Sequence, residues 1–328
     1  MAWSTVRVGR GTRKRHKVSV LGLGAMGGRH LRVLAAIPDR FEVMGGFDIR
    51  PDAAIPAGLR RFESEAEAIG RADLVVIATP IGEHARSASH ALGAGRHVFV
   101  EKPLCATTSE ARALMSAASG AACLFVGHSE RFNPVVRALA RMARDEDVAR
   151  AIDFCRVGPS KVLDAGVLLN LGVHDLDLAG YLGKGEPMLV GAVGARVTPG
   201  RGEDFAHVLL RLTSGALAHI ALDRTVPTKK RTVVFSSHLW TYEGDLLSHR
   251  LVRTARSTGV STDVPLPLEE PLFTQAQSLA DAIDGGAVRE IATLAEGARA
   301  VQLAEEAAAS CLSWAASESS SNAGGVPR

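Results

Sequence analysis

Cysteine is scarce in this sequence and shows no pattern. Four cysteines occur among 328 residues, at positions 105, 123, 155 and 311, and no two of them form a CxxC pair. Because most of them lie in apolar runs, they are predicted to be buried free thiols and not members of disulfides. Free thiols are typical of a reducing compartment, so we expect a cytoplasmic protein.

Long apolar runs are also missing. No stretch approaches the roughly 18 uninterrupted apolar residues of a transmembrane helix. The N-terminus has no apolar segment of the kind found at the centre of a signal peptide. The sequence therefore predicts no membrane-spanning segment and no membrane partner.

Charge and aromatic residues do not favour nucleic acid as a partner. The formal net charge is only +3, and much of the positive charge lies in the segment RVGRGTRKRHK at residues 7–17. No basic face with interleaved aromatic residues follows this segment. We interpret residues 1–16 as a disordered basic arm and residues 316–328, a low-complexity segment, as a disordered tail.

The length of the chain favours two domains, and the pattern along it supports this division. Between residues 17 and 128, short apolar runs alternate with helical patterns, as in the parallel βαβ units of a Rossmann domain. Thr107 and Glu110 have capping-box spacing, so one helix is expected to begin there. The other predicted elements are strands at 17–21, 41–47, 74–79, 97–101 and 123–127 and helices at 26–37 and 82–95.

Residues 129–315 have a different pattern, which predicts an α+β domain for substrate binding and oligomerisation. Asn133 is expected to cap a helix whose first residue is Pro134. Further helices are expected at 166–182 and within 272–310. The predicted strands are 151–158, 188–197, 205–212, 217–223, 231–237 and 238–244.

The expected fold class is therefore an α/β domain with a doubly wound parallel sheet, followed by an α+β domain with a large, mostly antiparallel, open-faced sheet. One face of the second sheet is apolar through segments such as VLLRL and AHIAL. Exposed apolar patches of this size usually mark an interface, so we predict a homodimer or homotetramer formed through this sheet.

A glycine motif follows the first predicted strand and opens a helix. The segment VSVLGLGAMGGRH contains GxGxxG as Gly22, Gly24 and Gly27, with Ala25 and Met26 between the last two glycines. Gly22 permits a tight turn, Gly24 lets a pyrophosphate approach the backbone, and Gly27 lets helix and strand pack closely. This context predicts a dinucleotide cofactor bound at this loop.

Asp48 and Arg50 bear on the choice between NAD and NADP. Asp48 ends the second predicted strand, 21 residues beyond Gly27. A carboxylate here binds the ribose hydroxyls of the adenosine and repels a 2′-phosphate, which favours NAD. Arg50 is either a solvated charge or a ligand for a 2′-phosphate, so NADP remains the alternative.

Two short segments lie at the ends of the next predicted parallel strands. Thr79 and Pro80, with His84 shortly after them, follow one strand, and Glu101, Lys102 and Pro103 follow the other. The carboxyl ends of parallel strands form the edge where doubly wound sheets bind ligands. Lys102 is therefore expected to point into the cofactor cleft, although a solvated loop lysine would produce the same sequence.

The glycine motif, the ATP segment with His84, and the EKP segment, in this order, resemble the glucose-fructose oxidoreductase, inositol dehydrogenase and rhizopine-catabolism (Gfo/Idh/MocA) family of NAD(P)-dependent oxidoreductases. The resemblance covers nearly the whole chain. It implies that Lys102 reaches both substrate and nicotinamide, and that Thr79 and Pro80 line the cofactor together with His84 and Glu101.

The resemblance also extends to NLGVHDLDLAGYL in the second domain, where related enzymes carry DxxxH. The corresponding residues here are Asn170 and His174, four positions apart and hence on one helix face. The resemblance implies that His174 is a general acid or base, and an unperturbed imidazole pKa near 6.5 suits this role. Asn170 lacks the charge of the usual carboxylate but can bind a sugar hydroxyl or position Lys102.

The segment GHSERFNP at 127–134 is similar to the sugar-nucleotide dehydrogenases of this family, particularly those that oxidise the 3-hydroxyl of UDP-N-acetylglucosamine. This implies that His128 and Arg131 contact substrate, with a purely structural role as the alternative for each. Asp175 and Asp177 are not expected to bind a metal, because neighbouring helix positions point in different directions. Instead, one of the two is expected to cap or pair with a nearby backbone or basic group.

The predicted activity is NAD-dependent oxidation of a secondary hydroxyl of a sugar or sugar nucleotide. Lys102, desolvated in the cleft, would accept the hydroxyl proton with a lowered pKa. Three alternatives remain open: an inositol or a keto-deoxy-sugar nucleotide as substrate, a non-catalytic NAD-binding regulator, and a nucleic-acid-binding module that uses the basic arm.

Overall fold

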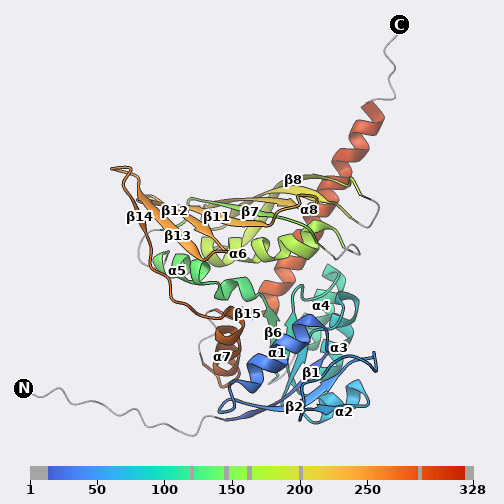
Figure 1. Cartoon of the computed structure of the whole chain (residues 1–328). Helices are drawn as coiled ribbons and strands as arrows, with labels where there is room; N and C mark the ends of the chain where they lie inside the picture. Colours follow the sequence, from blue (N-terminus) through green and yellow to red (C-terminus); the bar gives the residue numbers. More distant parts are fainter. Residues whose placement is uncertain are drawn as a thin grey trace, which may run out of the picture.

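Figure 1 shows a parallel α/β domain below a large second sheet, with a long C-terminal helix beside both. The computed structural model describes residues 14–118, 122–143, 148–160, 165–198, 202–286 and 290–321. Most of the predicted basic arm and residues 322–328 of the predicted tail lie outside the described residues, whereas residues 316–321, which were also predicted to be disordered, belong to a helix. In the described part of the chain, no helix combines the length and apolar character needed to cross a bilayer.

The first domain contains a seven-stranded sheet in the order β15-β6-β5-β4-β1-β2-β3. All neighbours are parallel except β15 and β6. Its central strands are apolar on both faces because helices cover both faces, as in other doubly wound sheets. The strands are β1 (His16–Leu21), β2 (Phe41–Phe47), β3 (Arg60–Arg61), β4 (Leu74–Ile77), β5 (His97–Glu101), β6 (Leu124–Gly127) and β15 (Ala292–Thr293).

Local sequence determines where several helices of this domain begin. Ser64 caps one helix by accepting a hydrogen bond from the Glu67 N–H. Thr107 and Glu110 form the predicted capping box, with both reciprocal bonds present. The helices are α1 (Ala25–Ala35), α2 (Glu65–Gly70), α3 (Ile81–Gly93) and α4 (Thr108–Ala117).

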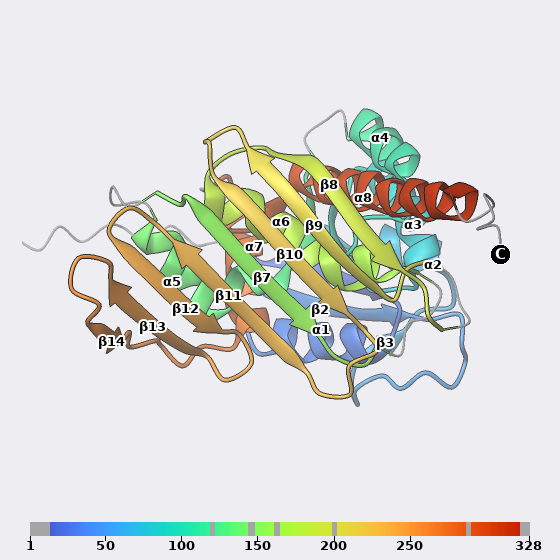
Figure 2. The ribbon, with the colours of Figure 1, turned by 90° about the horizontal axis from the view of Figure 1, so that it is seen from above.

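The second domain contains an eight-stranded sheet in the order β14-β13-β12-β11-β7-β10-β9-β8. Only β7 and β10 pair in parallel, so the sheet is mostly antiparallel, as predicted. Figure 2 shows its outer face without a covering helix, while α5 and α6 lie behind it. The strands are β7 (Ala151–Val157), β8 (Pro187–Ala195), β9 (Phe205–Leu212), β10 (Leu217–Asp223), β11 (Lys230–Ser236), β12 (Trp240–Asp245), β13 (Arg250–Ala255) and β14 (Ser261–Asp263).

Helical segments before and after β7 carry residues of both domains toward each other. The 3-10 helix η1 (Ser129–Phe132) is followed by α5 (Pro134–Met142), which Asn133 caps as predicted by accepting a hydrogen bond from the Val135 N–H. Another helix begins as one π-helical turn, η2 (Leu168–Gly172), and continues as α6 (Val173–Gly183). These segments deliver residues 128–131 and 170–177 to the region between the two sheets.

The C-terminal part of the chain differs from the prediction. The segment 272–310 was expected to form helix within the second domain, but α7 (Pro271–Ile283) packs against α1 and η1, and β15 joins the first sheet. Helix α8 (Leu294–Ser321) then contacts β6 and α4 on one side and α6 and β8 on the other. Apolar periodicity indicates which face of a helix is buried but not which domain buries it.

No disulfide joins any of the four cysteines, all of which lie in the described part of the chain. Cys105 and Cys311 are buried and Cys155 is partly buried, but Cys123 is exposed at the start of β6. The prediction of burial is thus wrong for Cys123, because apolar composition extends one residue beyond the buried part of the strand.

Candidate active site

A cavity of about 760 Å³ lies between the two domains, at the carboxyl ends of β4 and β5. This is the edge at which open α/β sheets bind ligands. Eight predicted site residues line the cavity: Met26, Thr79, Pro80, His84, Glu101, Lys102, Asn170 and His174. The remaining wall includes Arg29, Arg32, Ser129, Glu130, Arg231 and Glu270.

The glycine loop has the shape that a bound pyrophosphate requires. Gly22 has a φ of +85°, and a Cβ there would lie 2.5 Å from the carbonyl oxygen of Ala78. A Cβ on Gly27 would lie 1.8 Å from the Gly22 oxygen, whereas one on Gly24 would meet nothing within 4 Å. No side chain caps the N-terminus of α1, and its first turn has no acidic residue. The helix therefore presents free N–H groups to an anion.

Asp48 lies beside this loop at the end of β2. Its Oδ2 accepts a hydrogen bond from the Leu23 N–H at 2.8 Å. Arg50 donates to both carboxylate oxygens at 3.1 Å, and this contact lowers the pKa of Asp48 to about 2. The Arg50 guanidinium is exposed and paired with Asp48, and its role toward a cofactor stays a prediction.

Lys102 projects from the end of β5 into the cavity. Its Nζ donates a hydrogen bond to the backbone oxygen of Asn170 at 2.9 Å, so this contact bridges the two domains. Burial, together with the charges of Arg156 and Arg231 and against the opposing charge of Glu101, lowers the pKa of Lys102 to about 8. An amine with this pKa is partly neutral near physiological pH and can accept a proton.

Asn170 reaches Lys102 through its backbone and not through its amide. The side-chain Nδ2 instead donates to the Ser160 hydroxyl at 2.8 Å. The side-chain amide thus binds Ser160 in the neighbouring segment, whereas the backbone oxygen that binds Lys102 would be present with any residue at this position.

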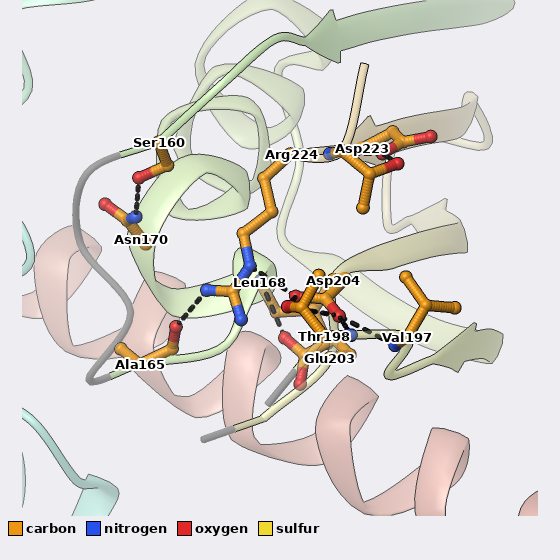
Figure 3. A network of polar contacts seen from close by, with 11 residues as sticks. Ser160, Ala165, Leu168, Asn170, Val197, Thr198, Glu203, Asp204, Asp223 and Arg224 are labelled. Carbon is orange, nitrogen blue, oxygen red and sulfur yellow. Dashed lines mark hydrogen bonds and ion pairs between the residues drawn. The ribbon is translucent and has the colours of Figure 1, made fainter. Parts of the chain in front are cut away.

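A polar network fixes the π-helical turn that carries Asn170 (Figure 3). Arg224 at the end of β10 pairs with the buried Asp204 at 2.6 Å and donates to the Ala165 oxygen at 2.7 Å. Glu203 accepts a hydrogen bond from the Leu168 N–H at 2.8 Å. Because these bonds hold both the start and the first turn of η2, they determine where the carbonyl that binds Lys102 lies.

His174 lines the cavity from the first turn of α6. Burial, together with the charges of Lys102 and Arg156, lowers the pKa of His174 well below 6.5. The expectation of an imidazole with an unperturbed pKa is therefore wrong. At neutral pH His174 is therefore a neutral ring with one N–H donor and one acceptor nitrogen, and it lacks the second, acidic proton of an imidazolium.

His84 and Glu101 organise the cavity from the first domain. The His84 Nδ1 lies 2.8 Å from the Pro103 oxygen and its Nε2 lies 2.9 Å from the Thr79 oxygen, so this buried ring joins the two predicted loops. Glu101 pairs with His30 of α1 at 2.6 Å. Sequence analysis missed His30, although its place in the helix after the glycine motif makes it a candidate.

His128 and Arg131 do not reach the cavity. Arg131 is buried, with its guanidinium on both oxygens of Asp177 at 2.8 and 2.5 Å and on Glu296. His128 is also buried, and it lies behind His174. Neither residue lines the cavity, because burial and, for Arg131, ion pairing hold them behind it; the structure thus favours the structural alternative for each, and a contact with substrate stays a prediction.

Sequence analysis also missed a buried ion cluster, of which Glu130 and Arg231 line the cavity. Arg156 donates to both oxygens of Asp175 at 2.8 Å and to Glu130 at 3.1 Å. Arg231, directly opposite Arg156 in the sheet, donates to the same Glu130 oxygen at 3.1 Å. Asp175 and Asp177 both pair with arginines, whereas only one of them was expected to pair or cap.

Fold and site together define a nicotinamide-dependent oxidoreductase. The open glycine loop and the uncapped α1 N-terminus fit a pyrophosphate, Asp48 fits a ribose diol, and the cavity around Lys102 fits a nicotinamide with a small substrate beside it.

Comparison with known proteins gives the family. The model for "Oxidoreductase family, NAD-binding Rossmann fold" matches residues 16–128, and the model for the "GFO/IDH/MocA C-terminal domain" matches residues 136–240. The chain is 30% identical over 258 residues to the UDP-N-acetylglucosamine 3-dehydrogenase of Acidithiobacillus ferrooxidans, an alignment that covers 76% of this chain and 80% of that enzyme. The chain belongs to the Gfo/Idh/MocA family of NAD-binding oxidoreductases.

Solved structures support the same conclusion. A structure of the Acidithiobacillus ferrooxidans enzyme matches with a TM-score of 0.82 at 29% identity, covering 90% of this chain and 98% of that one. GenD2 from gentamicin A biosynthesis, in complex with NAD, matches with a TM-score of 0.79 at 25% identity, covering 94% and 97%. The inositol 2-dehydrogenase of Rhizobium meliloti is 28% identical over 236 residues, 63% of this chain and 68% of that enzyme. The predictions of family, fold class, enzyme class and NAD as cofactor are confirmed.

Proposed function

We propose that this protein oxidises a secondary hydroxyl of a sugar or sugar nucleotide, with the 3-hydroxyl of UDP-N-acetylglucosamine as the first candidate. The observation that carries this proposal is the position of Lys102, an amine with a pKa of about 8 that faces the same cavity as His174. A base and a hydrogen-bonding ring from separate domains can hold one hydroxyl between them.

In the proposed reaction, the neutral amine of Lys102 accepts the hydroxyl proton. NAD, when bound, would supply the electron sink that accepts the hydride from the carbon that bears this hydroxyl. His174, a neutral ring, holds the hydroxyl in place, and the backbone oxygen of Asn170 orients the lysine. In the reverse direction, protonated Lys102 returns the proton to the carbonyl oxygen.

Arg231 supports a sugar nucleotide over a neutral polyol. It lines the cavity, and within the described residues its guanidinium donates only to Glu130, through Nη1. Its remaining N–H groups suit an oxygen-rich group such as a phosphate, which a planar guanidinium binds in bidentate fashion. An inositol offers only hydroxyls to the same donors.

The substrate is tested by incubating the full chain with NAD and a panel of UDP-sugars and inositols while NADH absorbance is recorded. We expect NADH with UDP-N-acetylglucosamine. Turnover of inositols alone would support the inositol dehydrogenase alternative, which the 28% identity to the Rhizobium meliloti enzyme keeps open. NAD binding without turnover of any sugar, in either direction, would contradict the proposal and favour a non-catalytic NAD-binding protein.

We further propose a homodimer or homotetramer that buries the outer face of the second sheet. Met188, Val190, Leu209 and Leu217 are all more than 40% exposed on its strands, and no helix of the described residues covers this face (Figure 2). We expect light scattering at micromolar concentration to give a dimer or tetramer, and Leu209→Asp to reduce its mass. Leu268→Asp, at an exposed position outside the sheet, is the control. A monomeric wild-type protein would contradict the proposal.

A further inference from the structure

Arg29 lines the active-site cavity and pairs with no carboxylate of the described residues. It lies on α1, one helical turn beyond Met26, and its side chain is exposed. In the described part of the chain, its one polar side-chain contact joins Nη1 to the sulfur of Met26 at 3.8 Å. A thioether is a weak acceptor, so the N–H groups of this guanidinium remain available to a ligand in the cavity.

Arg32 extends this basic surface along the same helix. Residues three apart lie on one helix face, so Arg29 and Arg32 are neighbours, and Arg32 lines the same cavity. The Arg32 guanidinium binds the carboxylate of Glu270, the residue before α7. Both side chains of this pair are more than 40% exposed, and exposed ion pairs contribute little to stability. A stronger acceptor in the cavity can therefore replace Glu270 as the partner of Arg32.

The two arginines of α1 lie on a different part of the cavity wall from Arg231. The charge of Arg231 contributes to the lowered pKa of both Lys102 and His174, which places Arg231 near the reacting groups. Arg29 and Arg32 instead line the part of the wall formed by α1 and the start of α7, two helices that contact each other. One cavity thus joins a site for the reacting hydroxyl to a second, basic site.

We infer that Arg29 and Arg32 bind the diphosphate of a nucleoside-diphosphate sugar. A planar guanidinium binds phosphate oxygens through two parallel hydrogen bonds, and two of them on one helix face match a ligand with two adjacent phosphates. Like charges three residues apart on a helix repel one another, and a bound diphosphate offsets this repulsion. The inference rests on the proposed function, which places the sugar ring of this ligand between Lys102 and His174.

The pyrophosphate of NAD is the other anion expected near α1. Its site is the N-terminus of this helix, where the loop through Gly24 is open and the first N–H groups are free. Arg29 lies one turn beyond that end, and Arg32 lies almost one turn further still. The position of the two arginines therefore favours the substrate over the cofactor. With NADH in the cofactor site, the two anions can be measured separately.

Calorimetric titration of UDP into the full chain saturated with NADH tests the inference without turnover. We expect Arg29→Met to raise the Kd for UDP roughly 10–100-fold, the usual effect of losing hydrogen bonds between charged groups. Arg29→Lys keeps the charge but not the planar fork, so its loss should be smaller. Uridine, which has no phosphate, should bind the wild type and Arg29→Met equally. Arg112→Met removes an exposed arginine of α4, outside the cavity lining, and is the control.

The inference would be overturned by a wild-type NADH complex that binds no UDP, or by an equal Kd for UDP in the wild type and Arg29→Met. A Kd for NADH raised more than about twofold in Arg29→Met would also overturn it, because Arg29 would then belong to the cofactor site. With UDP-N-acetylglucosamine as substrate, we expect Arg29→Met to raise KM by a factor similar to that for UDP and to keep kcat within a few-fold. UDP binding that depends on Arg29, in a chain that oxidises no sugar, would refute the proposed function alone.

Discussion

Replacing Lys102 by methionine is expected to lower kcat roughly 10²–10⁴-fold, the usual contribution of a general base. Methionine preserves the length and packing of the side chain but cannot accept a proton or donate to the Asn170 oxygen. NAD affinity should change little, because the glycine loop and Asp48 are untouched. Lys230→Met removes an exposed lysine from β11 and is the matched control. Turnover within a few-fold of the wild type would exclude Lys102 as the base.

The pH profile gives a second readout of the same residue. Oxidation requires the neutral amine, and with a pKa of about 8 only about a tenth of Lys102 is neutral at pH 7. The value of kcat/KM for oxidation should therefore rise about tenfold per pH unit below that pKa and level off above it. Reduction needs the protonated amine and should decline through the same range. The residual activity of Lys102→Met should lack this dependence.

Asp175→Ala is expected to destabilise the protein by about 3–5 kcal/mol, because it leaves Arg156 buried without its bidentate partner. Arg156 and Asp175 are both almost fully buried. Without Asp175, the only carboxylate left for Arg156 among the described residues would be that of Glu130, which also binds Arg231. The measurement is the urea unfolding curve, followed by a probe in the second domain such as Trp240. The control is Asp153→Ala, which removes an exposed aspartate from β7, the strand that carries Arg156. It should lower the free energy of unfolding by well under 1 kcal/mol.

A double variant separates charge from packing in this cluster. Asp175→Leu with Arg156→Met replaces the ion pair by apolar side chains of similar volume, which is often neutral or stabilising. We expect it to recover most of the stability lost in Asp175→Ala. If Asp175→Ala unfolded at the same urea concentration as the wild type, the buried pair would not have the structural importance assigned to it.

The parts of the site that sequence analysis predicted are those with local signals. Gly22, Gly24 and Gly27 stand next to one another in the chain, and the physical need for each follows from a turn and a close backbone approach. Lys102 was found because EKP ends a buried parallel strand, and such strand ends meet at one edge of the sheet. The lowered pKa of Lys102 follows from that position too, since a lysine in a cleft is desolvated.

The parts that were missed depend on pairing across the fold. Arg156 and Arg231 become neighbours only through the antiparallel register of β7 and β11, which nothing in their local sequence specifies. The placement of α7 against the first domain depends on which domain has an uncovered face. His128 and Arg131 were assigned to substrate by family resemblance, but their distance from the cavity is set by Asp177, on a helix 46 residues beyond Arg131.

The central claim is that Lys102 and His174 hold one hydroxyl against the bound nicotinamide. A crystal structure of the wild-type protein with NADH and the sugar that the panel identifies tests it most directly, because this dead-end complex does not react. The account predicts the reacting oxygen within hydrogen-bond distance of both Lys102 Nζ and His174 Nε2. A sugar seated in the same cavity with its hydroxyl bound to neither atom would contradict it.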